Sequence, residues 1–176
     1  MSTRLRVLLA AVALATSGIA LPATAAHAAS VDVTCIGTEA VTFQPGLLLT
    51  PQSVDVTVNG ILAPCTSSDP GITSGAYLES FTATLSCANL LDEFAGTRVF
   101  DWSSGRSSTF AYNRAVNVVL GQITVTFTGT IVSGEFAGDT AVEQVASVTP
   151  NSLECLAPPG FTSVGPHVAV LTIASP

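Results

Sequence analysis

Residues 123–131 read ITVTFTGTI, and this stretch indicates the fold class most clearly. Apolar residues and one glycine occupy the odd positions from Ile123 to Ile131, and threonines occupy the even positions between them. Successive side chains of a strand point to opposite faces, so a period of two sorts them between a core and water. The stretch therefore predicts a β-strand with one buried face.

The same alternation recurs along most of the chain, in residues 31–35, 54–59 and 80–87. Residues 168–173 are apolar on both faces, as in a strand at the middle of a packed sheet. We expect an all-β fold of eight or nine short antiparallel strands, arranged as a two-sheet β-sandwich. A small β-barrel is the alternative.

Turn residues separate these strands, among them Pro45-Gly46, Asn59-Gly60 and Pro158-Pro159-Gly160. Helical spacing is nowhere sustained, although residues 88–95 (ANLLDEFA) could form two helical turns or an ordered loop. A hairpin is predicted with Ser104-Gly105 at its turn, which places Phe100 opposite Thr109.

The first 28 residues have the parts of a secretory signal peptide. Arg4 and Arg6 precede a short apolar run, and small residues ending in Ala26-His27-Ala28 follow it. The apolar run is short for a membrane span, so we expect cleavage after Ala28 and no span in the mature chain. Residues 29–176 then form one secreted, extracellular domain.

Four cysteines fall in this mature part: Cys35, Cys65, Cys87 and Cys155. An even number of cysteines in an exported chain predicts two disulfides, and no C-x-x-C pair suggests zinc. Three pairings are open. We favour Cys35–Cys65 with Cys87–Cys155, because the first pair would join neighbouring strands.

The charge of the mature chain excludes two classes of partner. It contains no lysine, and three arginines stand against twelve acidic residues, a formal charge of −9. Nucleic acids and anionic membranes are bound through Lys and Arg, so neither is an expected partner.

Three stretches carry a resemblance: residues 35–51 (CIGTEAVTFQPGLLLTP), 101–113 (DWSSGRSSTFAYN) and 133–143 (SGEFAGDTAVE). They resemble a group of small, uncharacterised secreted proteins common in actinomycetes. The resemblance covers nearly the whole mature domain and implies a secreted, disulfide-bearing β domain. It implies no activity, cofactor or site residue.

No catalytic or metal-binding constellation is evident in the sequence. His167 is the sole mature histidine, and no G-x-S-x-G motif accompanies it. The acidic residues between Glu135 and Glu143 lack the spacing of a calcium loop, and no spacing of acids predicts the facing pair of a glycosidase. We therefore expect a non-enzymatic protein without a cofactor.

The remaining candidate is an interface made by Arg98, Trp102, Arg106 and Arg114, because arginine beside an aromatic residue is typical of interface hot spots. The favoured function is a non-catalytic extracellular binding or surface-associated module with an unknown partner, either a protein or a cell-wall polymer. One alternative is an inhibitor of a secreted enzyme such as a protease, which would present the loop 64–75. The other is a small hydrolase.

Overall fold

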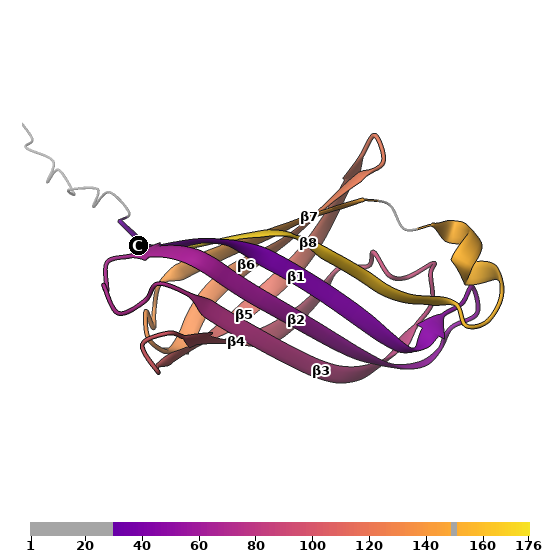
Figure 1. Cartoon of the computed structure of the whole chain (residues 1–176), viewed down its shortest axis with the longest axis horizontal. Coiled ribbons are helices and arrows are strands. Elements are labelled where there is room, and N and C mark those ends of the chain that lie inside the picture. The colour runs from indigo at the N-terminus through magenta and orange to yellow at the C-terminus, as the bar shows by residue number, and fades with distance from the viewer. Residues whose placement is uncertain (1–29, 149–150) are drawn as a thin grey trace, which may run out of the picture.

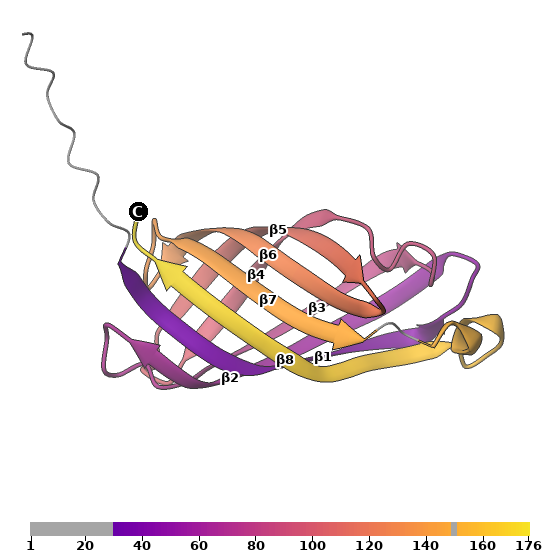
Figure 2. The same cartoon turned by 90° about the horizontal axis from the view of Figure 1, so that it is seen from above.

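The chain forms one β-sheet of eight antiparallel strands that closes on itself as a barrel (Figure 1, Figure 2). The structure is a computed structural model that describes residues 30–148 and 151–176. Each strand pairs with its neighbours in the sequence, and the last strand pairs with the first. The strands are β1 (Val31–Leu47), β2 (Gln52–Ser67), β3 (Gly75–Leu85), β4 (Phe94–Trp102), β5 (Ser107–Val119), β6 (Gln122–Gly134), β7 (Thr140–Val148) and β8 (Phe161–Ala174). A short 3-10 helix, Ser152–Leu156, precedes β8.

The all-β prediction is confirmed, but the two-sheet sandwich is wrong and the alternative, a small β-barrel, is correct. β1 pairs with β2 on one side and with β8 on the other, so Glu39 lies opposite both Gly60 and His167. The strands are also longer than the turn residues suggested, because β1 continues through Pro45-Gly46 and β2 through Asn59-Gly60. Long strands allow one sheet to curl until its first and last strands, β1 and β8, meet and pair.

The hairpin between β4 and β5 forms where it was predicted, but its register differs by one residue. Phe100 lies opposite Ser108 rather than Thr109. Gly105 N donates to Trp102 O, Trp102 N donates to Arg106 O, and Gly105 has a positive φ of 79°. This is a turn followed by a left-handed glycine, which uses one more residue than a two-residue turn.

One end of the barrel, which we call the plugged end, is filled by aromatic side chains. The ring of Phe100 lies 5.5 Å from that of Trp102 and 5.8 Å from that of Phe110. Trp102 meets Phe136 edge-on at 6.2 Å, and its indole N–H donates to Ser108 Oγ at 2.8 Å. The indole is buried with its polar atom satisfied. The plugged end carries the loops 68–74, 103–106 and 135–139.

The opposite end, which we call the open end, is less completely paired. β3 and β4 share only two paired positions, Gly75 with Trp102 and Ala76 with Asp101, both near the plugged end. Residues 86–93 connect the two strands as an ordered loop, so the loop alternative for the stretch 88–95 holds up to residue 93, and residues 94–95 begin β4. The hairpin of β5 and β6 projects away from the barrel at the same end (Figure 1).

The favoured disulfide pairing is the one that the structure contains. Cys35 and Cys65 are bonded to each other and are directly opposed on β1 and β2. Cys87 of the 86–93 loop is bonded to Cys155 of the 3-10 helix, so this disulfide joins two connections at the open end. Two disulfides are typical of proteins that work in an oxidising environment.

The C-terminus lies beside the beginning of β1 (Figure 1), where Ser175 N donates to Ser30 O at 3.0 Å. The predicted signal peptide, residues 1–28, and its cleavage site lie outside the described residues. Within the described part of the chain, no helix has the length and apolar character to cross a membrane.

Candidate functional site

Two tyrosines lie flat inside the barrel because glycines face them from neighbouring strands. Tyr77 of β3 is opposite Gly60 of β2, and Tyr112 of β5 is opposite Gly96 of β4. A Cβ atom at either glycine would collide with the tyrosine ring. Glycine in a strand permits this close approach at a cost in local stability. The two glycines therefore fix both phenols in the interior.

Arg98 of β4 points into the barrel and is bound by three carboxylates. Its Nε bonds Glu79 and its Nη1 bonds Glu143, while its Nη2 lies 3.1 Å from Glu39 Oε2. Arg98 is 2% exposed and Glu143 is 0% exposed. Charges this deeply buried are tolerated only when they are paired and hydrogen-bonded. The contacts tie β4 to β1, β3 and β7.

The tyrosines complete this group. Tyr77 Oη lies 2.8 Å from Glu143 Oε1 and 2.9 Å from Glu39 Oε2. A phenol has one proton to donate, so Tyr77 donates to one of these two groups, and the other contact is a hydrogen bond when that carboxyl group carries a proton. Tyr112 Oη donates to Glu79 Oε2 at 3.2 Å. We call the whole set the Arg98 cluster: Arg98, Glu39, Glu79, Glu143, Tyr77 and Tyr112.

Glu143 is the carboxyl group of the cluster whose protonated form is favoured by burial. Burial raises the pKa of Glu143 to about 7, although the positive charge of Arg98 opposes that rise. Burial by itself would lower the pKa of Arg98, but Glu143 and the other surrounding groups raise it overall, so Arg98 stays charged. With Glu143 protonated, the cluster still has one negative charge in excess, because Glu39 and Glu79 face a single guanidinium.

Between the Arg98 cluster and the open end, the barrel contains a cavity of about 390 Å³. Glu39, Glu79 and Arg98 line its inner end. Its walls are apolar side chains from several strands, including Val41, Phe43, Val56, Val58, Val125 and Phe127. The cavity thus has a polar, charged floor and apolar walls.

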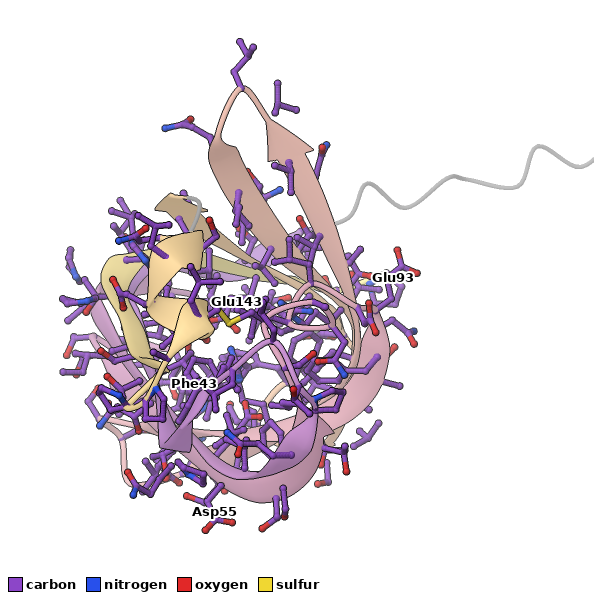
Figure 3. All side chains as sticks on the ribbon, turned by 90° about the vertical axis from the view of Figure 1, so that its right-hand side faces the viewer. Phe43, Asp55, Glu93 and Glu143 are labelled. Atoms are coloured by element: carbon purple, nitrogen blue, oxygen red, sulfur yellow. A yellow bond between two sulfur atoms is a disulfide. The ribbon has the colours of Figure 1, made fainter. Side chains whose placement is uncertain are left out.

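The cavity reaches solvent at the open end. Phe81 of β3 and Phe94 of β4 line it and are 40% and 44% exposed. Phe81 belongs to the inward-facing series of β3, and its exposure follows from the separation of β3 from β4. Figure 3 looks onto this end, with Glu93 at the rim and Asp55 on the outer face of the barrel.

The 86–93 loop beside this opening is held from two sides. Arg114 Nη1 donates to Asp92 O at 2.6 Å, and its Nη2 donates to Leu90 O at 3.3 Å. Burial lowers the pKa of Arg114. On the other side, the Cys87–Cys155 disulfide fixes the loop to the 3-10 helix. The opening therefore has a defined rim.

The structure does not bring the four predicted interface residues together on one surface. Arg98 and Trp102 are buried on the inward face of β4, so they are not available to a partner at the surface. Arg106 lies at the plugged end, half exposed and paired with two carboxylates. Arg114 lies at the open end. That Arg106 or Arg114 contacts a partner stays a prediction.

The other candidate residues are dispersed. His167 lies on β8 and lines the cavity. Glu135 is paired with Arg106 at the plugged end, whereas Glu143 is inside the barrel, so the acidic stretch does not form one cluster. No group of three or more His, Cys, Asp or Glu side chains in residues 30–148 and 151–176 is placed to hold a metal ion.

Glu39, Glu79 and Glu143 were not predicted from the sequence as members of one site. The alternation of side chains along the strands nevertheless indicates that Glu79 and Glu143 face inward. Glu79 has the same parity as Phe81 and Ala83, apolar residues of the alternating stretch 80–87, and Glu143 has the same parity as Val145. A carboxylate at an inward position of a strand requires a buried partner.

Comparison with known proteins adds no relative: no family model, no curated protein and no solved structure matches this chain. The resemblance to small secreted actinomycete proteins therefore stays a prediction, and the function has to be argued from the cavity and the residues that line it.

Proposed function

We propose that this protein is a secreted, non-catalytic binding protein that holds a small, largely apolar molecule inside its barrel. The observation that carries this proposal is the cavity of about 390 Å³, which opens to solvent at one end. Cavities that bind small molecules typically measure about 300–1,000 Å³ and have apolar walls with a few placed polar groups. The cavity of this barrel has that size and that composition.

The barrel suits a binding role because its two ends are built differently. Aromatic rings fill the plugged end, whereas the open end, where β3 and β4 are unpaired, gives a ligand a way in and out. The disulfide between Cys87 and Cys155 and the contacts of Arg114 fix one side of that opening. A preformed opening reduces the conformational entropy lost when a ligand binds.

The state of the interior carboxylates favours binding over catalysis. Glu39, Glu79 and Glu143 all bond Arg98, and Glu143 is fully buried. A general acid or base needs a proton that it can exchange with a substrate at hydrogen-bond distance. Carboxylates that are all bonded to Arg98 therefore suit a fixed polar floor better than the role of a general acid or base.

The proposal is tested with N-phenyl-1-naphthylamine, a neutral apolar dye that fluoresces strongly in apolar surroundings. We expect saturable binding to the purified protein with one site per chain. Ala83→Trp places a large ring in the cavity, because Ala83 lines it from β3, and should abolish this binding.

Ala76→Trp is the matched control. Ala76 lies on the same strand but faces outward, so this variant should bind the dye like the unmodified protein. Equal binding by both variants, or no saturable binding by the unmodified protein, would show that the cavity is not a binding site.

A further inference from the structure

We propose that the molecule bound in the cavity is a cationic amphiphile: an apolar body with a protonated amine that points toward Glu39 and Glu79. This inference rests on the proposed function and names the chemical class of its ligand. It follows from the charge balance of the groups that line the cavity.

Arg98, the guanidinium at the floor of the cavity, is already surrounded by carboxylates. Each of its three nitrogens bonds a different carboxylate. Its faces are covered as well, since the guanidinium carbon lies 4.0 Å from the ring centre of Tyr77 and 4.6 Å from that of Phe127. One N–H remains on each of Nη1 and Nη2, but a ligand carboxylate that reached them would lie beside Glu143 and Glu39, whose negative charge repels it.

The same contacts leave negative charge facing the cavity. Glu39 and Glu79 both line it and share one guanidinium, and Glu143 behind them adds further negative charge whenever it ionises. Glu39 makes its contacts with Arg98 and Tyr77 through the same oxygen, Oε2. The floor thus attracts a positive group and repels a carboxylate.

The rim of the opening carries negative charge, like the floor of the cavity. Asp92 and Glu93 line the opening, and the facing cation, Arg114, donates to the backbone oxygens of Leu90 and Asp92. His167 also lines the cavity and is the remaining basic side chain there. Phe81 adds an exposed ring that can stabilise an ammonium group through a cation–π contact, whereas the ring of Phe94 already lies against Arg114, 5.2 Å from its guanidinium carbon.

The test uses three ligands that share one alkyl chain: n-decylamine, decan-1-ol and decanoate. Each is titrated near neutral pH against bound N-phenyl-1-naphthylamine, where the amine is protonated and the acid is ionised. We expect decylamine to bind at least about tenfold more tightly than decanoate, with decanol between them, as a hydrogen bond between charged groups would give.

Glu39→Gln should weaken decylamine about tenfold and leave decanol unchanged, because one charged partner is lost while the apolar walls remain. Glu93→Gln is the second variant, since Glu93 lines the cavity but makes no contact with Arg98, and a smaller loss in the same direction is expected. Asp55→Asn, on the outer face, is the control for general attraction to an acidic protein (Figure 3). It should change none of the three affinities.

The outcomes separate the two proposals. Decanoate binding as tightly as decylamine, or an equal loss of decylamine affinity in the Asp55 and Glu39 variants, overturns the cationic ligand while the binding function stands. Failure of all three ligands and of the dye to bind overturns the binding function itself.

Discussion

Replacing Arg98 with methionine is expected to destabilise the barrel more than any other change of a surface or interior charge. The substitution keeps an unbranched side chain of similar length but removes the charge that faces Glu39, Glu79 and Glu143. Removing one partner of a buried ion pair costs about 3–5 kcal/mol, because it leaves an uncompensated buried charge. Since small domains are stable by about 5–15 kcal/mol, this loss would be a large part of the total.

The control is Arg106→Met. Arg106 also contacts two carboxylates, Asp69 and Glu135, but its side chain is 50% exposed. An exposed ion pair contributes about 0–1 kcal/mol, so this variant should unfold nearly like the unmodified protein. The two substitutions therefore share their chemistry and differ in burial.

Urea unfolding followed by the fluorescence of Trp102, the single tryptophan, measures both variants. At about pH 7.5 the Arg98 variant should lose the full amount, and at about pH 5 it should recover part of it, because buried carboxylates without a cation take up protons. Equal losses for the two variants, or no recovery in acid, would refute the claim that Arg98 balances buried carboxylates.

Three further changes test other parts of the structure. The first is Glu143→Gln. In the unmodified protein, burial raises the pKa of Glu143 from 4.5 to about 7, so the native state keeps a proton that the unfolded chain loses. The stability of the unmodified protein should therefore fall by about 3 kcal/mol as pH rises between these two pKa values. The variant should show a flatter urea-stability profile against pH, and an equally steep one would contradict the assignment. Gly60→Ala places a methyl group against the Tyr77 ring, so the free energy of unfolding should fall by about 1–3 kcal/mol and the near-ultraviolet circular dichroism spectrum should change. An unchanged Tm would contradict the close packing. Replacing Cys87 and Cys155 with serine removes a disulfide that joins residues 68 positions apart, and should cost about 4 kcal/mol of stability in the chain-entropy model. The 86–93 loop should then be cut faster by proteases. Resistance to cleavage there would contradict the role of this disulfide.

The alternation of side chains predicted the β class correctly because each strand has one face toward the core. It did not predict the closure of the sheet. Closure depends on the pairing of β1 with β8, which lie at opposite ends of the chain, and no local pattern encodes that contact. Turn residues within β1 and β2 also suggested shorter strands than form, since Pro45-Gly46 and Asn59-Gly60 lie inside strands here.

The site was harder to predict than the fold, for a related reason. Arg98 was noticed because few arginines are present, and it alternates in step with the buried Phe100 and Trp102 of β4, but its partners lie far from it in the sequence. Its three carboxylate partners come from β1, β3 and β7. Only the closed barrel brings these strands together around one side chain.

The most direct test of the cavity as a binding site is an NMR titration of methyl-labelled protein with decan-1-ol, recording nuclear Overhauser effects between the alkyl chain and valine methyl groups. The structure predicts contacts with Val58 and Val125, which line the cavity from β2 and β6. Contacts confined to Val118 and Val119, which are exposed near the tip of the projecting hairpin, would place the ligand outside the barrel and contradict the account.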